Sequence, residues 1–211
     1  MTTASEPLTA PRESQRPPAD PVAMPRLILD EAARLLRAHG YEATTVRAIA
    51  DRVGIKAGSL YHHYPSKDAI VAAVLNDGVR IVFDAVQAAL AALPPDASPR
   101  DRLEAATRAH LLSSLENSDY TSASIRAFAF LPGAVRAECR RERRRYEAIW
   151  AGLVRQASDA GLIRPGISLD VVRLMLLGAV NWAGEWYRPG RLSIDRIARD
   201  FADLVLGPRP E

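Results

Sequence analysis

The segment from Thr44 to Lys67 constrains the fold of this chain more than any other. It reads TTVRAIADRVGIKAGSLYHHYPSK. Apolar residues recur at helical spacing from Val46 to Val53, preceded by a threonine, Thr44 or Thr45, that can cap the helix. Gly54 then supplies a residue that tolerates positive φ, as a turn between two crossing helices requires. The pattern therefore predicts a helix-turn-helix, which is a DNA-binding motif.

The second helix of this pair is expected to run from Lys56 to His63. Ile55 and Leu60 would seat it against the first helix, so the remaining side chains face outward, where they can reach bases and phosphates. Tyr64 is expected to pack inward instead. The residues expected to contact DNA are Thr44, Thr45, Arg47, Lys56, Ala57, Gly58, Ser59, Tyr61, His62, His63 and Lys67.

Lysine occurs only in this part of the chain. Of 28 basic residues, two are lysines, Lys56 and Lys67. Ser66 is expected to cap the following helix, so that the first backbone N–H groups of that helix and the ammonium of Lys67 can bind the same phosphate. A solvated surface lysine is the alternative.

The run GIKAGSLYHHYPSKD, residues 54–68, resembles the recognition-helix signature of TetR-type transcriptional repressors. The resemblance extends over about residues 26–75. It implies an all-α fold of about nine helices, with a three-helix DNA-binding head at residues 25–67 and a body at residues 68–211 that binds a ligand and dimerises. It also implies that the aromatic ring at Tyr61 touches a phosphate.

Composition limits what else the chain could be. A net charge of +3 is too small to coat nucleic acid, but Arg26 to Lys67 alone hold seven basic and four acidic residues, so the positive charge is local. The single cysteine, Cys139, excludes an internal disulfide and fits a reducing compartment. We find no apolar run of membrane-spanning length, no phosphate loop, no nucleophile elbow and no metal-spaced Cys/His cluster. We therefore expect a cytoplasmic protein that is not an enzyme and has no cofactor, metal or membrane partner.

Helix-capping residues, prolines and glycines divide the rest of the chain into a tail and a series of helices. Residues 1–24, with five prolines, are expected to form a disordered tail; the alternative is an arm whose arginines reach a minor groove. Helices are expected at about residues 25–39, 46–53, 56–63, 66–92, 98–115, 120–131, 134–160, 168–187 and 193–206. The helix that begins at Ser66 would span roughly 40 Å, enough to connect the head to the body.

The last two expected helices favour a homodimer. Residues 169–187 are apolar nearly all round, so that helix must be buried on more than one side. With the final helix it could form a four-helix interface between two copies, although both could instead fill the core of a monomer. A dimer would read a roughly palindromic operator on double-stranded DNA. The expected dimer contacts are Val172, Leu176, Ala179, Ala183, Ile194, Ile197, Phe201 and Leu204.

Residues 177–201, with their aromatic run NWAGEWY, resemble the C-terminal end of TetR-type regulators of fatty-acid and steroid-ring degradation, some of which respond to acyl-CoA thioesters. Independently, the arginines at residues 136–145 suit phosphates, and Tyr146 and Trp150 could line an apolar pocket. The expected ligand contacts are Arg140, Arg144, Tyr146, Trp150, Trp182, Trp186, Tyr187 and Arg188.

These patterns predict a repressor that a small-molecule effector, an acyl-CoA thioester of lipid or steroid catabolism, releases from DNA. The effector would tilt the helix that begins at Ser66 and change the separation of the two heads. Three alternatives stay open. The arginines could be a solvated face, the tryptophans could be dimer packing, and the effector could be a hydrophobic drug or natural product that controls an efflux or biosynthetic gene.

Overall fold

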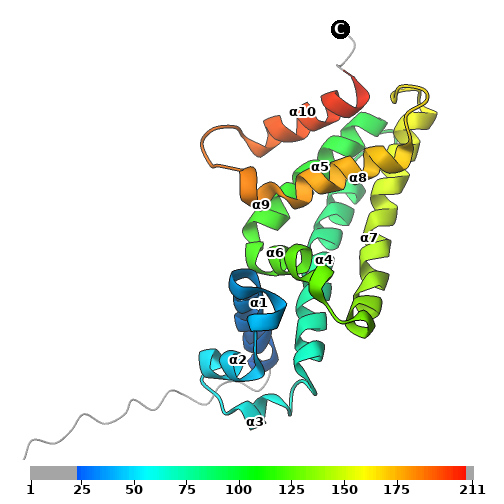
Figure 1. The fold of residues 1–211 in the computed structure, drawn as a ribbon. Helices are drawn as coiled ribbons and strands as arrows, with labels where there is room; N and C mark the ends of the chain where they lie inside the picture. The colour runs from blue at the N-terminus through cyan, green and yellow to red at the C-terminus, as the bar shows by residue number, and fades with distance from the viewer. Residues whose placement is uncertain (1–22, 208–211) are drawn as a thin grey trace, which may run out of the picture.

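The computed structural model describes residues 23–207, and within them the chain is all-α, as predicted (Figure 1). It forms ten α-helices and one 3₁₀ turn. They are α1 (Met24–Ala43), α2 (Val46–Val53), α3 (Ala57–Leu60), α4 (Lys67–Ala91), α5 (Pro99–Glu116), α6 (Ser118–Ala127), η1 (Phe128–Phe130), α7 (Gly133–Asp159), α8 (Leu169–Asn181), α9 (Ala183–Trp186) and α10 (Ile194–Leu206). The disordered tail predicted for residues 1–24 lies outside the described residues, except for its last two.

The head consists of α1, α2 and α3. The side chain of Thr45 accepts a hydrogen bond from the N–H of Ala48 at the start of α2, and Gly54, at φ 82°, ends the helix. Burial of Leu60 holds α3 against the other two helices. The helix predicted for residues 56–63 is regular only over α3, because the chain continues from it as hydrogen-bonded turns.

The α4 helix connects head and body, as predicted. Its first half, from Ile70 to Leu75, belongs to the core of the head, whereas Val79, Val82 and Val86 belong to the core of the body. In Figure 1 α4 runs upward from α3 through the middle of the molecule. A tilt of α4 would therefore move the head relative to the body.

The α6 helix lies between α1 and α4 (Figure 1). The hydroxyl of Tyr120 donates to Asp30 Oδ1 at 2.6 Å, and Arg37 Nη1 donates to Asp119 Oδ1 at 2.8 Å. A second route from body to head thus runs through α6 and α1.

The count of about nine helices was too low because the helix predicted for residues 168–187 is interrupted. The backbone of Trp182, at φ −89° and ψ 6°, separates α8 from the short α9, whose Ala183 is fully buried. Figure 1 shows the chain changing direction at this point before α10 returns across α5 and α8. None of the helices in residues 23–207 has the length and apolar character needed to span a membrane.

Candidate DNA-binding surface and effector cavity

The residues predicted to contact DNA lie around α3, at the lower end of the molecule in Figure 1. Tyr61 is 54% exposed, and Leu60 beside it is fully buried, so α3 presents one face to solvent. The exposed members of the set are Thr45, Arg47, Lys56, Gly58, Ser59, Tyr61, His62 and His63; Ala57 and Lys67 are partly exposed. This face is thus accessible to a partner, and the individual DNA contacts stay a prediction.

Thr44 is the exception. It is fully buried, and its hydroxyl donates to the carbonyl of Gly40 at 2.7 Å. Gly40 has φ 74°, which bends the chain at the end of α1 and turns Thr44 inward. The prediction that Thr44 contacts DNA is therefore wrong, and of the two candidate caps Thr45 is the one that caps α2. Tyr64 packs against the core of the head, as predicted.

Lys67 begins α4, which Ser66 caps by accepting from the N–H of Ala69 at 3.1 Å. Its Nζ lies over the ring of Tyr41, 4.0 Å from the ring centre. The hydroxyl of Tyr41 donates to Asp68 Oδ1 at 2.5 Å, and burial together with this hydrogen bond raises the pKa of Tyr41 to about 12. A neutral ring therefore holds the ammonium beside the first N–H groups of α4, where an anion is favoured.

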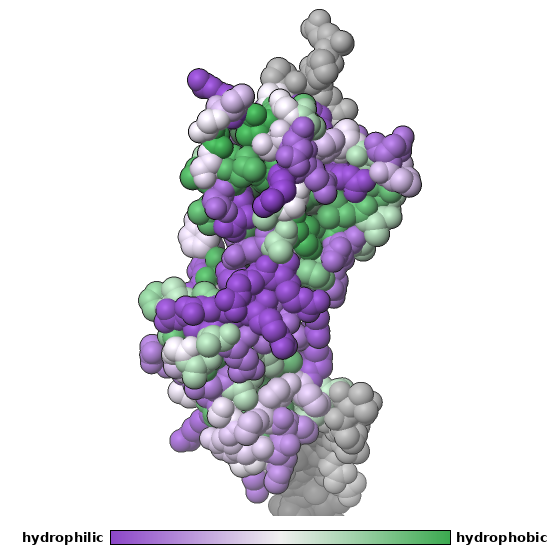
Figure 2. All heavy atoms as spheres, turned by 90° about the vertical axis from the view of Figure 1, so that its right-hand side faces the viewer, coloured by the Kyte–Doolittle hydropathy of each residue, from purple (hydrophilic) through white to green (hydrophobic). Residues whose placement is uncertain are grey.

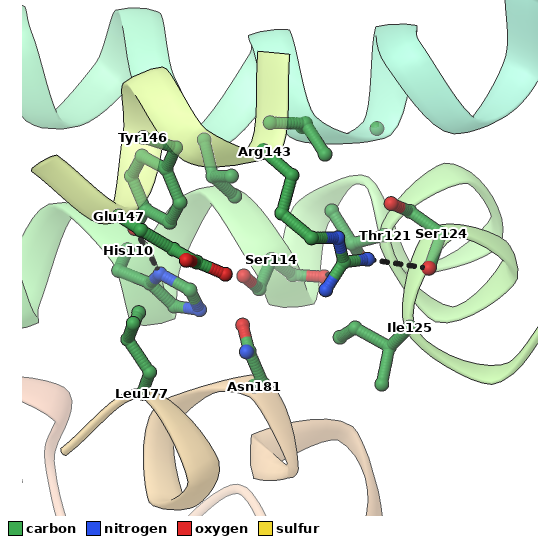
Figure 3. A pocket seen from close by; sticks show the side chains of 13 residues that line it. His110, Ser114, Thr121, Ser124, Ile125, Arg143, Tyr146, Glu147, Leu177 and Asn181 are labelled. Atoms are coloured by element: carbon green, nitrogen blue, oxygen red, sulfur yellow. Dashed lines mark hydrogen bonds between the residues drawn. The ribbon is translucent and has the colours of Figure 1, made fainter. Parts of the chain in front are cut away.

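A small cavity, with about 40 Å³ open to the centre of a water-sized sphere and partly open to solvent, lies in the body between α4, α5, α6, α7 and α8 (Figure 3). Val79, Val82, Ile125 and Leu177 give it apolar walls. The remaining residues that line the cavity are mostly polar, which is unusual for a buried space. The polar lining residues are His110, Ser114, Thr121, Ser124, Arg143, Tyr146, Glu147 and Asn181.

His110 and Tyr146 form a buried pair in the wall of this cavity. His110 Nδ1 lies 2.5 Å from the hydroxyl of Tyr146. Burial lowers the pKa of His110 to about 3, against a smaller opposing effect of the Val180 backbone, and burial also raises the pKa of Tyr146. Both groups are therefore neutral at physiological pH. Trp150 packs edge-on to both rings.

Arg143 and Glu147 stand one helical turn apart at the rim of the cavity. Arg143 donates to the carbonyl of Ser124 at 2.9 Å and lies over the ring of Phe128, and burial lowers its pKa. Glu147 Oε2 lies 3.6 Å from Arg173. The rim thus carries a carboxylate between two guanidinium groups.

Only some of the residues predicted to contact the ligand lie at or near the cavity. Tyr146 lines the cavity, and Trp182 lines a shallow groove that shares Ile125 and Asn181 with it. Arg140 and Arg144 are exposed on α7 outside the cavity wall. Figure 2 shows a hydrophilic band across the middle of this side of the molecule.

Four other predicted ligand contacts are not at the cavity. Trp150 is fully buried behind Tyr146, so its assignment as a ligand contact is wrong. Trp186 stacks on Phe201 and donates its indole N–H to the carbonyl of Ala179. Tyr187 packs against the core of the body, and Arg188 donates to backbone carbonyls of its own turn. The break at Trp182 separates these residues from the cavity-facing side of α8.

The polar residues of α5 were missed by the sequence analysis. Thr107, His110 and Ser114 recur at helical spacing on the buried face of α5. Polar side chains on the buried face of a helix indicate a cavity with polar walls. The sequence of α5 contains this signal. The partners on α7 and α8 carry no such signal, because they come from remote parts of the chain.

Two family models match the chain. The model described as bacterial regulatory proteins, tetR family, matches residues 28–74, and the tetracyclin repressor-like C-terminal domain matches residues 96–208. The chain belongs to the TetR family. It is thus a TetR-type DNA-binding transcriptional repressor and not an enzyme. Among residues 23–207 no group of three His, Cys, Asp or Glu side chains is placed to hold a metal ion.

Two curated relatives and one solved structure cover most of this TetR protein. The HTH-type transcriptional repressor KstR2 of Mycolicibacterium smegmatis is 29% identical over 90% of this chain and 92% of its own length. KstR2 of Rhodococcus jostii is 31% identical over 85% of this chain and 87% of its own. The crystal structure of AibR in complex with isovaleryl coenzyme A and operator DNA is 30% identical, with a TM-score of 0.77 over 88% of this chain and all of AibR.

An exposed apolar face covers α8 and α10 of this TetR protein. Leu204 is 84% exposed and Met175 is 70% exposed, and both line an apolar hollow with Phe201. Val172, Ala179 and Phe201, from the predicted dimer set, are partly buried and line it, whereas Ile194 packs against the core of the body. Leu176 is buried but lines the hollow as well, so its predicted role stays a prediction. Ala183 and Ile197 belong to the chain's own core, so the prediction that they contact a second copy is wrong.

Proposed function

We propose that this repressor is released from its operator by an acyl-CoA thioester whose acyl group enters the cavity. The observation that carries the proposal is a buried cavity that opens beside a row of arginines. The cavity, with about 40 Å³ open to a water-sized sphere, admits only a few heavy atoms, so the nucleotide portion would lie outside on the protein surface. The AibR structure, which contains isovaleryl coenzyme A, supports the same effector class here.

The arrangement of arginines on α7 supports a phosphate site at the rim. At about 100° per residue, Arg140 and Arg144 lie about 60° and 100° around the helix from Arg143, on the side where Glu147 lies. Arg141 and Arg145 lie about 160° away and pair with Glu142. An effector that leaves the cavity past Arg143 would therefore meet Arg140 and Arg144, whose guanidinium groups suit pyrophosphate.

The same cavity can control the head. Thr121, Ser124 and Ile125 of α6 line it, and the preceding turn of α6 holds α1 through Asp119 and Tyr120. An effector that binds better when α6 moves outward shifts the population toward that state. The movement would tilt α4 and carry α1 with it, so that two heads no longer fit successive major grooves.

We further propose that the apolar face of α8 and α10 joins two copies of the chain. An exposed patch with Leu204, Met175 and Leu174 would be costly in water for a monomer. A two-fold axis on this face would place two copies of α3 on the same side of the assembly, as a roughly palindromic operator requires.

The effector class is tested by operator release. Fluorescence anisotropy of labelled operator DNA would be measured with a panel of acyl-CoA thioesters, the free acids, CoA and hydrophobic drugs. We expect release by short acyl-CoAs and not by free acids. Release by hydrophobic drugs alone would contradict the proposal and favour the efflux alternative.

The phosphate site is tested by two matched double variants. Arg140→Ala with Arg144→Ala should weaken acyl-CoA binding about ten-fold, since each lost charge-assisted contact at an exposed rim is worth about 0.5–1 kcal/mol. Arg141→Ala with Arg145→Ala removes the same charge from the other side of α7 and should leave the affinity within about two-fold. Equal losses in both double variants would show that α7 attracts the effector only through its total charge.

A further inference from the structure

The wall of the cavity carries a buried polar group without a partner. Ser114 Oγ makes no hydrogen bond to any described residue, although Ser114 is only 8% exposed. A buried hydroxyl without a partner destabilises the protein. It indicates a place where a polar part of a ligand binds.

Side chains from two other helices converge on the same place. Figure 3 shows Asn181 of α8 and Glu147 of α7 directed toward Ser114, with Arg143 beside them. The drawn hydrogen bonds are those from Arg143 to Ser124 and between His110 and Tyr146, and neither joins Ser114, Asn181 or Glu147 to one another. The three side chains thus border the same cavity from three helices.

The hydrogen-bonding capacity at this point is mixed. Glu147 only accepts, Ser114 and Asn181 both donate and accept, and Arg143 only donates. The neutral ring of His110 already contacts the Tyr146 hydroxyl and the Val180 backbone. A ligand group that both donates and accepts can therefore pair with all sides of the site.

A hydroxyl group meets this requirement more fully than the common alternatives. A methyl group would leave Ser114 unpaired. A carbonyl oxygen can accept from Ser114 and Asn181 but gives Glu147 no proton, so it pairs with fewer sides of the site. The apolar walls at Val79 and Leu177 suit a short hydrocarbon chain next to the hydroxyl.

We infer that the effector is the CoA thioester of a short hydroxyacyl group, whose hydroxyl binds between Ser114, Asn181 and Glu147. This inference rests on the proposed function, because it names the acyl group that enters the same cavity. It makes the repressor a sensor of hydroxylated acyl intermediates rather than of saturated ones.

The test is isothermal titration of the full-length protein with matched thioesters. 3-Hydroxybutyryl-CoA and 4-hydroxybutyryl-CoA would be compared with butyryl-CoA and succinyl-CoA. We expect at least one hydroxyacyl-CoA to bind about ten-fold more tightly than butyryl-CoA, because one or more buried groups gain partners. Butyryl-CoA or succinyl-CoA binding as tightly as both hydroxyacyl-CoAs overturns the inference and leaves the proposed function standing. Absence of binding by every CoA thioester overturns the proposed function itself.

Two neighbouring serines give a matched pair of variants. Ser114→Ala should remove most of the preference for the hydroxyacyl-CoA while leaving the affinity for butyryl-CoA within about two-fold. Ser113 is equally buried, but its hydroxyl lies 3.4 Å from the carbonyl of Ile81 and it does not line the cavity. Ser113→Ala should therefore keep the preference. An unchanged preference in a folded Ser114→Ala protein would refute the assignment of the site.

Discussion

Gly78 lies where α4 packs closely against α6, and replacing it with alanine should force the two helices apart. A Cβ atom at Gly78 would lie 2.5 Å from the carbonyl oxygen of Tyr120 and 3.0 Å from Cβ of Ser124. An ordinary contact needs about 3.4 Å, so α6 would have to move by about 0.9 Å. Because the opposing atom belongs to the backbone, no rotation of a side chain can relieve the clash.

The expected loss of stability in Gly78→Ala follows from two opposing effects. Overpacking of a closely packed interior costs about 1–3 kcal/mol, and a backbone carbonyl places this case near the upper end. Alanine in a helix gains about 1 kcal/mol over glycine. The net loss in the free energy of unfolding for Gly78→Ala is therefore about 2 kcal/mol. In a chain of this size that loss lowers the melting temperature by about 4–8 °C.

Gly152 provides the matched control. It also lies inside a helix, α7, but a Cβ atom there meets nothing within 4 Å. Gly152→Ala should raise the melting temperature by about 2–4 °C, since only the gain in helix propensity remains. Both variants would be measured by scanning calorimetry at one protein concentration, because a dimer makes melting depend on concentration. A Gly78→Ala protein as stable as Gly152→Ala would refute the close approach of α6 to α4.

Four further predictions concern single residues. Lys67→Ala should weaken binding to all DNA sequences alike and flatten the salt dependence of operator binding by about one unit; an unchanged slope would mean that Lys67 touches no phosphate. Because native His110 has a pKa of about 3 and the unfolded chain protonates near pH 6.5, wild type should lose up to about 1.4 kcal/mol of stability per pH unit from pH 6.5 down toward pH 3, relative to His110→Gln. If the free energies of unfolding of wild type and His110→Gln changed equally over that pH range, this prediction would be wrong. Burial raises the pKa of Cys139 to about 11, so its thiol should react with a disulfide reagent at pH 8 only after the protein is unfolded in urea. Leu204→Glu should convert the dimer to a monomer in light scattering, whereas Leu192→Glu, outside the apolar hollow, should not; a dimer in both would place the interface elsewhere.

The helix starts of this protein were readable from local sequence. Thr45, Ser66, Ser98 and Ser193 each cap a helix by accepting from the N–H three residues later. Such a cap depends on a side chain and a backbone group within the same turn, so the residues involved lie next to each other in the sequence. The helix-turn-helix with Gly54 at its turn is determined in the same way.

The ends and interruptions of helices were less predictable. The break at Trp182 and the shortening of α3 to four residues carry no proline or glycine signal at the point of change. Both occur where the buried side chains Ala183 and Leu60 fit against other helices. Packing against remote elements overrides local helix propensity at such positions.

The sequence by itself determined that this chain is helical, where most helices begin, and that its head binds DNA, because these properties follow from contacts between residues a few positions apart. Only the tertiary structure decided which faces of the body meet. His110 and Tyr146 are 36 residues apart and Asn181 lies on a third helix, yet all three border one cavity. The choice of Arg143 over Arg140 at its rim, and of Thr45 over Thr44 at the surface, likewise depends on how each helix is rotated against its neighbours. That rotation is set by the packing of the whole core, which no local pattern contains.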